Sequence, residues 1–529
     1  MPARLHPGVY VEEVPSGARA IEAAGTSTAI FVGDTERGPL TPTKIKGVAD
    51  YERVFGGFKR HTGAAPAAEK VVLRYAIDAF FRNGGTSAYV LRAIVNTTVD
   101  PANKGTRAGI DIEASSPGQW SENLAVVLGE SSDGDASRFR LFVVYTFPGT
   151  SDGVVVERWD RLTATSTDEN YAKDVLLRSN YIRWKDVAVV QPAGPAEIAG
   201  TSPLDKDVVI AAAGHLLTGG TNGDTAFPNG DLPGLLSALD EINDAGLLVV
   251  PAQIGEADND VKGRTDAALS YALGRPRQDL FCVADMPRSG NQSTTDATSA
   301  TAGYMKAGQP NAFSTITNFG GVYFPWVEIS DPAGTGRDPT IYVGPSSFVA
   351  GVCARTDQRR GVWKAPAGLD ATVLNVRRLE YNLLDSHQDD LNPLGVNALR
   401  AQPGGGNVVW GARTMQPSSE WRYVPVRRMA IFLRTSIYNG IQWAVFEPND
   451  EPLWSQLRLT IGGFMEQLFR QGAFAGRTTR EAFFVKCDSE TTPEADQIAG
   501  IVNVSVGFAP LRPAEFVVVR LSQIVNQKA

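Results

Sequence analysis

The chain has 529 residues, of which 43% are hydrophobic and 20% charged, and it contains 53 glycines and 32 prolines. This composition excludes a largely disordered or fibrous protein, and the length predicts about three or four domains with many turns. The net charge of -8, without a basic cluster along the sequence, argues against nucleic acid as a partner, because binding of the phosphate backbone needs concentrated Lys and Arg.

The first predicted elements are a lone strand and an α/β layer. Residues 7–14 (PGVYVEEV) lie between turn-forming Pro and Gly residues, which favours a strand. Residues 15–28 form a small, polar connector that offers no hairpin partner, so this strand must pair elsewhere. The next segments predict a strand over 27–33, a helix over 69–82 and a strand over 87–94. This order is typical of a sheet covered by a helix.

The pattern changes between residues 96 and 203. Strand-like runs at 124–128, 138–147 and 153–159 alternate there with turns rich in Asp, Ser and Gly, so we expect an inserted, mostly β module. The α/β pattern then resumes, and its expected elements are a helix over 232–242, a strand over 246–251, a helix over 258–273 and a strand over 279–284. These two strands are apolar on both faces, as buried parallel strands are.

The last part of the chain ends in a second lone strand. Residues 515–521 (EFVVVRL) are a short apolar run that follows a connector containing two prolines. Before it, we interpret residues 428–434 (RMAIFLR) as a strand, residues 451–471 as a helix, and residues 482–488 and 501–507 as strands.

The helix at 451–471 has clear start signals and one weak point. Asn449 and Asp450 are candidate N-caps, and Pro452 suits the first turn. Gly462 and Gly463 cost helix stability, roughly 1 kcal/mol each relative to Ala, which indicates close approach by another helix of this chain or by a partner. The expected apolar stripe is Leu453, Leu457, Ile461 or Phe464, and Leu468.

Signatures of catalysis and metal binding are missing from the sequence. None of the four histidines shows HExxH or HxH spacing, and neither a G-x-S-x-G elbow nor a GxxxxGK[ST] loop is present. The Gly/Asp-rich segment 219–231 offers oxygen ligands for calcium, but it lacks the spacing of an EF-hand and is typical of turns. We therefore predict no catalytic, cofactor-binding or metal-binding residues, and structural thiols at Cys282, Cys353 and Cys487.

The two terminal strands carry the functional argument. A strand without a neighbour presents idle backbone donors and acceptors, and it therefore usually pairs with a sheet edge. The strands either close a sheet within their own chain or add to sheets of neighbouring copies, and the pattern alone leaves both alternatives open. The apolar runs are far shorter than the roughly 20 residues that span a bilayer, and residues 1–10 lack a signal-peptide core, so we expect a soluble protein that starts in the cytosol.

Eight segments carry a resemblance to a known family, and their order along the chain makes the set specific. They are residues 7–14, 26–33, 216–224 (LLTGGTNGD), 357–368 (DQRRGVWKAPAG), 406–414 (GNVVWGART), 438–449 (YNGIQWAVFEPN), 451–454 (EPLW) and 513–516 (PAEF). With these segments the sequence resembles the contractile tail sheath proteins of bacteriophages and of related phage-tail-like injection systems.

The resemblance implies a mixed α/β, multidomain fold with terminal strand-exchange arms. The expected parts are an N-terminal arm and linker (1–28), a middle α/β domain (29–95 plus 204–372), an inserted outer β-rich domain (96–203), a tube-proximal domain (373–507, in similar proteins built from both chain ends) and a C-terminal linker and arm (508–529). The arm residues are Val9, Tyr10, Val11, Glu12, Glu13, Val14, Phe516, Val517, Val518, Val519, Arg520 and Leu521.

The resemblance also implies a non-enzymatic, self-assembling protein. Its copies would stack as a helical sleeve around an inner tube and contract to drive that tube through a target envelope, with Arg458, Glu466 and Arg470 contacting the tube. The implied partners are other copies, the inner tube protein, and baseplate and tail-terminator or cap proteins. Assembly would take place in the bacterial cytoplasm, and the mature particle would be a virion tail or a phage-tail-like particle. A static tail or tube protein and an α/β enzyme are the alternatives.

Overall fold

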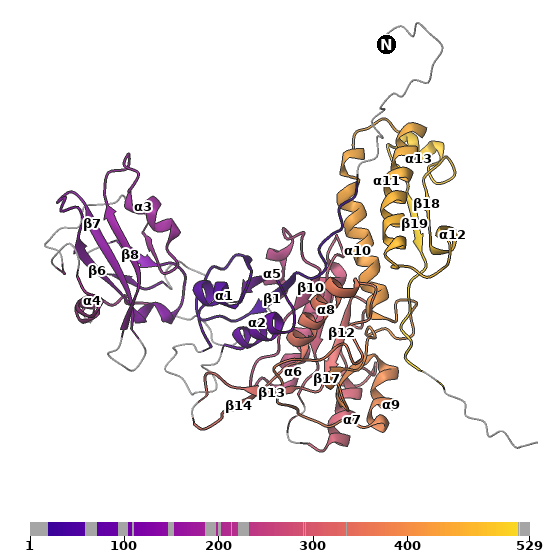
Figure 1. The fold of residues 1–529 in the computed structure, drawn as a ribbon, viewed down its shortest axis with the longest axis horizontal. Coiled ribbons are helices and arrows are strands. Elements are labelled where there is room, and N and C mark those ends of the chain that lie inside the picture. Colours follow the sequence, from indigo (N-terminus) through magenta and orange to yellow (C-terminus); the bar gives the residue numbers. More distant parts are fainter. Residues whose placement is uncertain are drawn as a thin grey trace, which may run out of the picture. The chain divides into compact units, whose positions relative to one another are not determined.

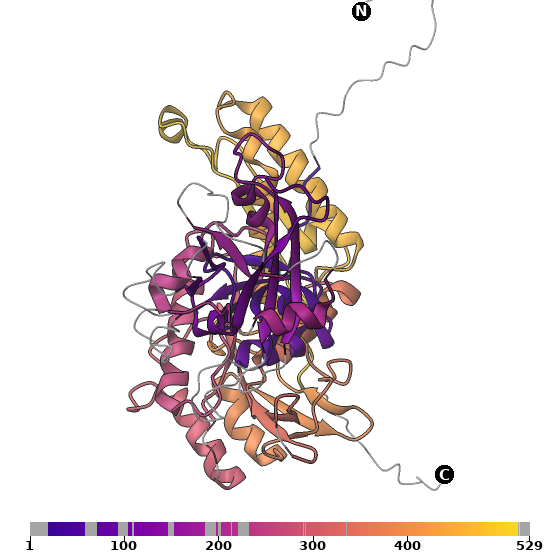
Figure 2. The same cartoon turned by 90° about the vertical axis from the view of Figure 1, so that its left-hand side faces the viewer.

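A computed structural model of the chain separates into two compact units (Figures 1 and 2). The central unit comprises residues 25–428, and the terminal unit comprises residues 429–529 together with residues up to Ala24. The structure describes residues 20–58, 71–93, 104–107, 111–146, 153–185, 197–198, 203–212, 214–220, 232–288, 290, 292–334, 336–516 and 518.

An eight-stranded sheet forms the core of the central unit. Its strands lie in the order β17-β16-β12-β11-β10-β1-β3-β2, and the six inner strands run parallel while the two edge strands pair antiparallel. Every residue of β1, β11 and β12 is buried, as expected for parallel strands covered on both faces. The strands are β1 (Ala29–Gly33), β2 (Thr43–Ile45), β3 (Ala88–Arg92), β10 (Leu247–Val249), β11 (Phe281–Asp285), β12 (Gly320–Phe324), β16 (Val396–Gln402) and β17 (Gly406–Val409).

Helices with apolar faces cover this sheet. α2 and α8 pack against each other, with α2 on β1 and α8 on β10 and β11, and α6 also contacts β10 and β11. Edge-to-face packing of Phe31 on Phe80, with ring centroids 5.2 Å apart, joins β1 to α2. The helices that lie wholly in the described part of this unit are α1 (Val48–Phe55), α2 (Val72–Arg82), α3 (Ala172–Val175), α4 (Asp205–Ala212), α5 (Leu232–Leu236), α6 (Asp258–Gly274), α7 (Thr294–Tyr304), α8 (Ser346–Arg360) and α9 (Asp385–Leu391).

The predicted α/β elements are confirmed with small changes in length. The strands expected at 27–33, 87–94, 246–251 and 279–284 are β1, β3, β10 and β11, and the helices expected at 69–82 and 258–273 are α2 and α6. The helix expected over 232–242 is shorter, because α5 ends at Leu236 and a 3₁₀ turn over Ser237–Leu239 follows.

The described strands between residues 106 and 184 form two small sheets that share no strand with the large sheet. The strands expected at 124–128, 138–147 and 153–159 are confirmed as an antiparallel meander of β6 (Leu124–Glu130), β7 (Phe139–Thr146) and β8 (Gly153–Leu162). One face of the meander packs in a hydrophobic core that includes Trp120. The second sheet consists of β4 (Thr106–Arg107), β5 (Ile112–Ala114) and β9 (Ile182–Trp184).

The central unit continues past the predicted domain boundary at residue 372. β16 pairs in parallel with β12, from Val322↔Val396 to Phe324↔Ala398, and β17 pairs with β16. Both strands lie in the segment 373–507 that the sequence assigned to the tube-proximal domain. The boundary between the compact units falls instead at Arg428. A further antiparallel sheet of this unit consists of β13 (Val327–Ser330), β14 (Thr340–Val343) and β15 (Arg378–Leu379).

The strand predicted at 428–434 is wrong, because these residues lie in helix α10 (Val424–Gly440). A short apolar run does not reveal its own period, so a strand and a buried helix segment look alike in sequence. The structure resolves the ambiguity, since the buried side chains Val426, Met429, Leu433 and Ser436 recur at spacings of three and four residues.

A buried ion pair fixes the start of α10 within the central unit. The guanidinium of Arg428 donates to both carboxylate oxygens of Asp357, at 2.9 and 2.6 Å, and to the carbonyl oxygen of Thr26. The two side chains are only 3% and 4% exposed. Burial alone would lower the pKa of Arg428, but the charge of Asp357 raises this pKa above its ordinary value. The pair therefore joins α8, α10 and the chain that leads into β1.

The terminal unit contains the predicted long helix, α11 (Glu451–Arg470). Asp450 caps this helix, since its Oδ1 accepts from the backbone N–H of Leu453 at 3.3 Å. The predicted apolar stripe is buried, and both Ile461 and Phe464 belong to it. The other elements are α12 (Thr479–Ala482), β18 (Phe483–Lys486), α13 (Glu494–Ile498) and β19 (Ser505–Phe508). None of the helices in the described ranges has the length and apolar character needed to cross a membrane.

Candidate functional site

The sheet of the terminal unit has two strands and two open edges. β18 and β19, predicted at 482–488 and 501–507, pair antiparallel from Phe483↔Phe508 to Lys486↔Ser505. Among the described residues no third strand joins them, and the one neighbouring pairing is an isolated antiparallel bridge between Phe474 and Pro510, just past the end of β19. A ribbon of two strands is marginally stable alone, and each open edge offers backbone groups to a further strand. The geometry therefore provides two places for strand addition.

Helix α11 holds this ribbon in place. Leu453, Trp454 and Leu457 pack with the buried Cys487 at the end of β18. Arg458 donates to the carbonyl oxygen of Cys487 and forms an ion pair with Glu451 at 2.5 Å. The ribbon is thus anchored on one side by packing and a charge-assisted hydrogen bond, which fixes the direction of its strands.

The predicted arm residues are mostly outside the described residues. This holds for Val9, Tyr10, Val11, Glu12, Glu13 and Val14, and for Val517, Val519, Arg520 and Leu521. Phe516 and Val518 are described, and their side chains are 76% and 79% exposed. Neither of these two residues lies in a strand. Pairing of the arms with the open ribbon therefore stays a prediction.

Exposed apolar side chains gather in the terminal unit. Of the nineteen exposed large hydrophobic residues in the described ranges, ten lie between Tyr438 and Val518. Phe446 is the most exposed of them, and its φ of +71° is unusual for an aromatic residue. Exposed apolar side chains are therefore more frequent in this part of the chain than in the other described residues. Sequence reasoning missed Phe446, whose conformation has no signal in the local pattern.

The three predicted tube-contact residues divide between two environments on α11. Glu466 and Arg470 form an ion pair at 2.6 Å, and their side chains are 47% and 75% exposed. Arg458 is 32% exposed and bound within its own chain, as described above. The structure therefore brings Glu466 and Arg470 together on an accessible face, while Arg458 supports the ribbon.

The glycine pair of α11 has an unexpected environment. No described atom outside the helix lies within 4 Å of the Cβ position at Gly462 or Gly463. Among the described residues, no other helix therefore approaches these glycines closely, and contact with a partner stays a prediction. Leu459, one turn earlier, is 56% exposed and borders the same surface. Leu459 lies outside the apolar stripe predicted for α11, and this position is the sequence signal for its exposure.

The segment before β1 is bound to α10 within the terminal unit. The backbone N–H of Ala24 donates to Oγ of Ser436 at 2.9 Å, and Ile21 is buried. A Cβ atom at Gly440 would lie 2.6 Å from Cγ1 of Ile21, so this contact requires glycine. The predicted connector at 15–28 is thus held in place from Ile21 onward.

The described residues contain no group of three or more His, Cys, Asp or Glu side chains that could hold a metal ion. Of the Gly/Asp-rich segment considered for calcium, residues 221–231 lie outside the described residues. The three cysteines are buried free thiols.

Comparisons with known proteins place the chain among tail sheath proteins. Models of the phage tail sheath protein central domain and of the phage tail sheath C-terminal domain match residues 229–415 and 416–524. The tail sheath protein of Vibrio phage KVP40 is 30% identical over 159 residues, which are 30% of this chain and 23% of that relative. The tail sheath protein of Enterobacteria phage T4 is 28% identical over 132 residues, or 25% and 20% of the two chains. The chain thus matches less than a quarter of the length of these two relatives.

Two solved structures show the same fold over nearly the whole chain. The sheath complex of an extracellular contractile injection system, PVC, in its contracted state has a TM-score of 0.57 at 22% identity and covers 100% of both chains. The contracted helical sheath of the anti-feeding prophage has a TM-score of 0.56 at 22% identity and covers 98% of this chain and 100% of that one. Because the two family models account in order for residues 229–524, more than half of its length, the chain belongs to the phage tail sheath family.

Proposed function

We propose that this chain is the subunit of a contractile tail sheath. Its copies polymerise as a helical sleeve around an inner tube, and contraction of the sleeve drives the tube through a target cell envelope. The observation that carries the proposal is the ribbon of β18 and β19, whose two open edges match in number the two predicted arms. One arm from each of two neighbouring copies would complete a four-stranded sheet, so that backbone hydrogen bonds link each copy to its neighbours.

The partners follow from this arrangement. They are other copies of the chain, the inner tube protein, and the baseplate and tail-terminator or cap proteins that close the two ends of a sleeve. The proposed site of assembly is the bacterial cytoplasm, and the mature location is a virion tail or a phage-tail-like particle. The work is mechanical and not enzymatic, with free energy stored in the extended array at assembly.

The accessible face of α11 is the proposed contact with the inner tube. Glu466 and Arg470 supply exposed charges, and Gly462 and Gly463 supply a surface without side chains where another backbone can approach closely. Arg458 contributes by holding the ribbon against the helix. Because exposed ion pairs are screened by salt, tube binding through this face should weaken as ionic strength rises.

Replacing Gly462 and Gly463 by Ala should separate stability from tube binding. Each substitution should stabilise the isolated chain by about 0.5–1 kcal/mol, because Ala is the better helix former and the Cβ position is free. The same methyl groups should reduce co-sedimentation with inner tubes, because they occupy the contact surface. Gly303→Ala, in α7 and equally open at its Cβ position, is the matched control and should leave tube binding unchanged. Unimpaired tube binding by the double variant would contradict this contact.

Electron microscopy of the purified chain, alone and with the inner tube protein, tests the proposed function. We expect striated tubes of uniform width that are narrower when the inner tube is present, since only a contractile sheath has two packings of one sequence. Tubes of one invariant width would indicate a static tail protein. Discrete small particles under all conditions would contradict self-assembly.

A further inference from the structure

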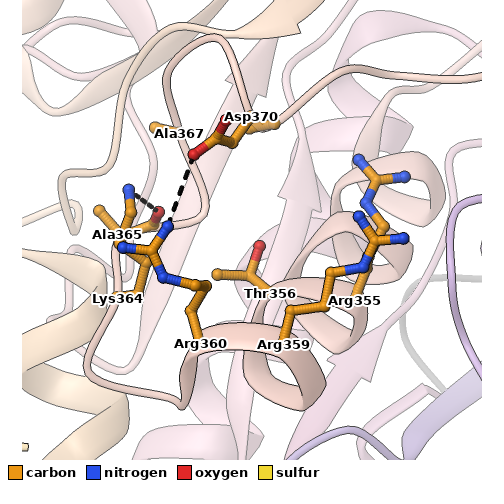
Figure 3. Close-up of a pocket in the computed structure, with 9 residues that line it drawn as sticks. Arg355, Thr356, Arg359, Arg360, Lys364, Ala365, Ala367 and Asp370 are labelled. Atoms are coloured by element: carbon orange, nitrogen blue, oxygen red, sulfur yellow. Dashed lines mark hydrogen bonds and ion pairs between the residues drawn. The ribbon is translucent and has the colours of Figure 1, made fainter.

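A cationic pocket lies at the C-terminal end of α8 in the central unit (Figure 3). Its volume is about 250 Å³, and small side chains of Ala365, Ala367 and Ala371 form part of its wall. Four cations and a single carboxylate line it: Arg355, Arg359, Arg360, Lys364 and Asp370. These cations are spread over ten residues of sequence, which is why no basic cluster is evident before the chain folds.

The turn that ends α8 gathers these charges. Gly361 adopts a φ of +87°, and its N–H donates to the carbonyl oxygen of Asp357 at 2.9 Å, which terminates the helix. The N–H of Lys364 then donates to the carbonyl oxygen of Gly361 at 3.1 Å. This tight reversal brings Lys364 back beside Arg360, on the opposite side of the pocket from Arg355 and Arg359 (Figure 3).

The positive charge in the pocket is poorly neutralised. Arg355 donates to the carbonyl oxygens of Asn83 and Thr372, which carry no net charge. Arg359, exposed beside it, forms no ion pair with any residue in the described ranges. Burial, and then the neighbouring charge of Arg359, lower the pKa of Arg355 below its ordinary value. The one pair with Asp370, from Arg360 at 3.7 Å, joins side chains that are 60% and 82% exposed and contributes little.

Helix termination alone does not account for this arrangement. Cations in the last turn of a helix interact favourably with the helix dipole, which explains Arg359 and Arg360. Arg355 lies a turn further back in α8, and Lys364 lies beyond its end. Both nevertheless line the same pocket.

We propose that this pocket binds a carboxylate side chain of a second copy of the chain, an inference that rests on the proposed self-assembly. Each copy carries a net charge of -8, so two copies repel unless cations are concentrated where they meet. The guanidinium groups suit a carboxylate geometrically, and the small alanine wall leaves room for one acidic side chain. The pocket thus sets both the register and the salt dependence of the contact between copies.

Charge reversal with R359E/R360E tests the role of the pocket in assembly. The variant should need an approximately tenfold higher protein concentration to polymerise, because a carboxylate would then face carboxylates. R277E/R337E, which reverses two exposed cations elsewhere in the central unit, is the matched control and should polymerise like the wild type. Equal effects of the two double variants, or no effect of R359E/R360E, would overturn the inference.

Carbodiimide cross-linking identifies the partner carboxylate. The Lys364 amine becomes joined only to a carboxylate that it touches, and a mixture of ¹⁴N- and ¹⁵N-labelled chains distinguishes bonds between copies from bonds within one copy. We expect mixed-isotope cross-links at Lys364 in the polymer, fewer of them at high salt, and none in the unassembled chain. Cross-links confined to one chain, such as to Asp370, would overturn the inference.

Titration with inorganic phosphate and with free glutamate distinguishes a small anion from a second copy. Both anions should compete with polymerisation of the wild type and leave R359E/R360E unaffected. A phosphate that binds the wild-type pocket without altering its assembly would show a small-molecule site and overturn the inference. A wild-type chain that forms no polymer would instead contradict the proposed function itself.

Discussion

Replacing Asp357 by Asn should lower the free energy of unfolding of the central unit by about 3–5 kcal/mol, because it leaves Arg428 buried without its counter-ion. Both side chains are almost inaccessible to water, so the guanidinium cannot recover the lost interaction by hydration. The pair also holds the carbonyl of Thr26, and its loss should loosen the start of β1. Calorimetric unfolding of the full chain measures the change.

Two further variants make this experiment specific. Replacing both partners, with D357L/R428M, removes the buried charges together and should cost far less than the single substitution. Asp338→Asn breaks an ion pair of 2.5 Å whose side chains are 38% and 63% exposed, and it should change stability by less than about 1 kcal/mol. A single Asp357→Asn variant as stable as Asp338→Asn would show that the buried pair is not a stabilising feature.

Deleting residues 1–14, or replacing Val518 by Pro, should abolish polymerisation while the subunit stays folded. Each arm is predicted to add a strand to a neighbour, and Pro removes a backbone donor from that ladder. We expect no tubes by electron microscopy at any protein concentration at which the wild-type chain forms them. Circular dichroism and calorimetry should show the folded subunit.

Val518→Thr controls for the change of side chain, since Thr is also β-branched and keeps its backbone N–H. This variant should polymerise like the wild type. Normal tubes from the deletion or the Pro variant would contradict strand exchange, and would mean that the ribbon of β18 and β19 finds other partners.

The sequence predicts elements well where burial leaves a local signal. β1, β10 and β11 are apolar on both faces, and α11 has a cap and a stripe, so periodicity and boundary residues identify them. The short apolar run at 428–434 fits the repeat of a strand as well as that of a helix, so the sequence does not identify α10. The extension of the large sheet by β16 depends on pairing with β12, a contact across 74 residues between Val322 and Val396 that no local pattern encodes.

In the candidate site, too, the sequence predicts some features, and only the structure shows the others. The lone strands at both ends were visible because Pro and Gly isolate them, whereas their proposed receptor is visible only once β18 and β19 are seen without a third strand. Glu466 and Arg470, predicted as tube contacts, lie together on an accessible face of α11. The pocket around Arg355 required the turn at Gly361, since chain reversal and not sequence proximity brings its charges together.

The binding of Ile21 and Ala24 to α10 limits how far apart neighbouring subunits can lie. An extended chain advances at most about 3.6 Å per residue, so an arm ending at residue 14 reaches about 25 Å from Ile21, against about 50 Å if the connector were free as far as Ala29. In the proposed array, a receiving ribbon would have to stay within the shorter distance in every packing. Contraction of the proposed array would then be limited to rotations and displacements that keep neighbouring subunits within this distance, and residues inserted before position 21 would relax the limit.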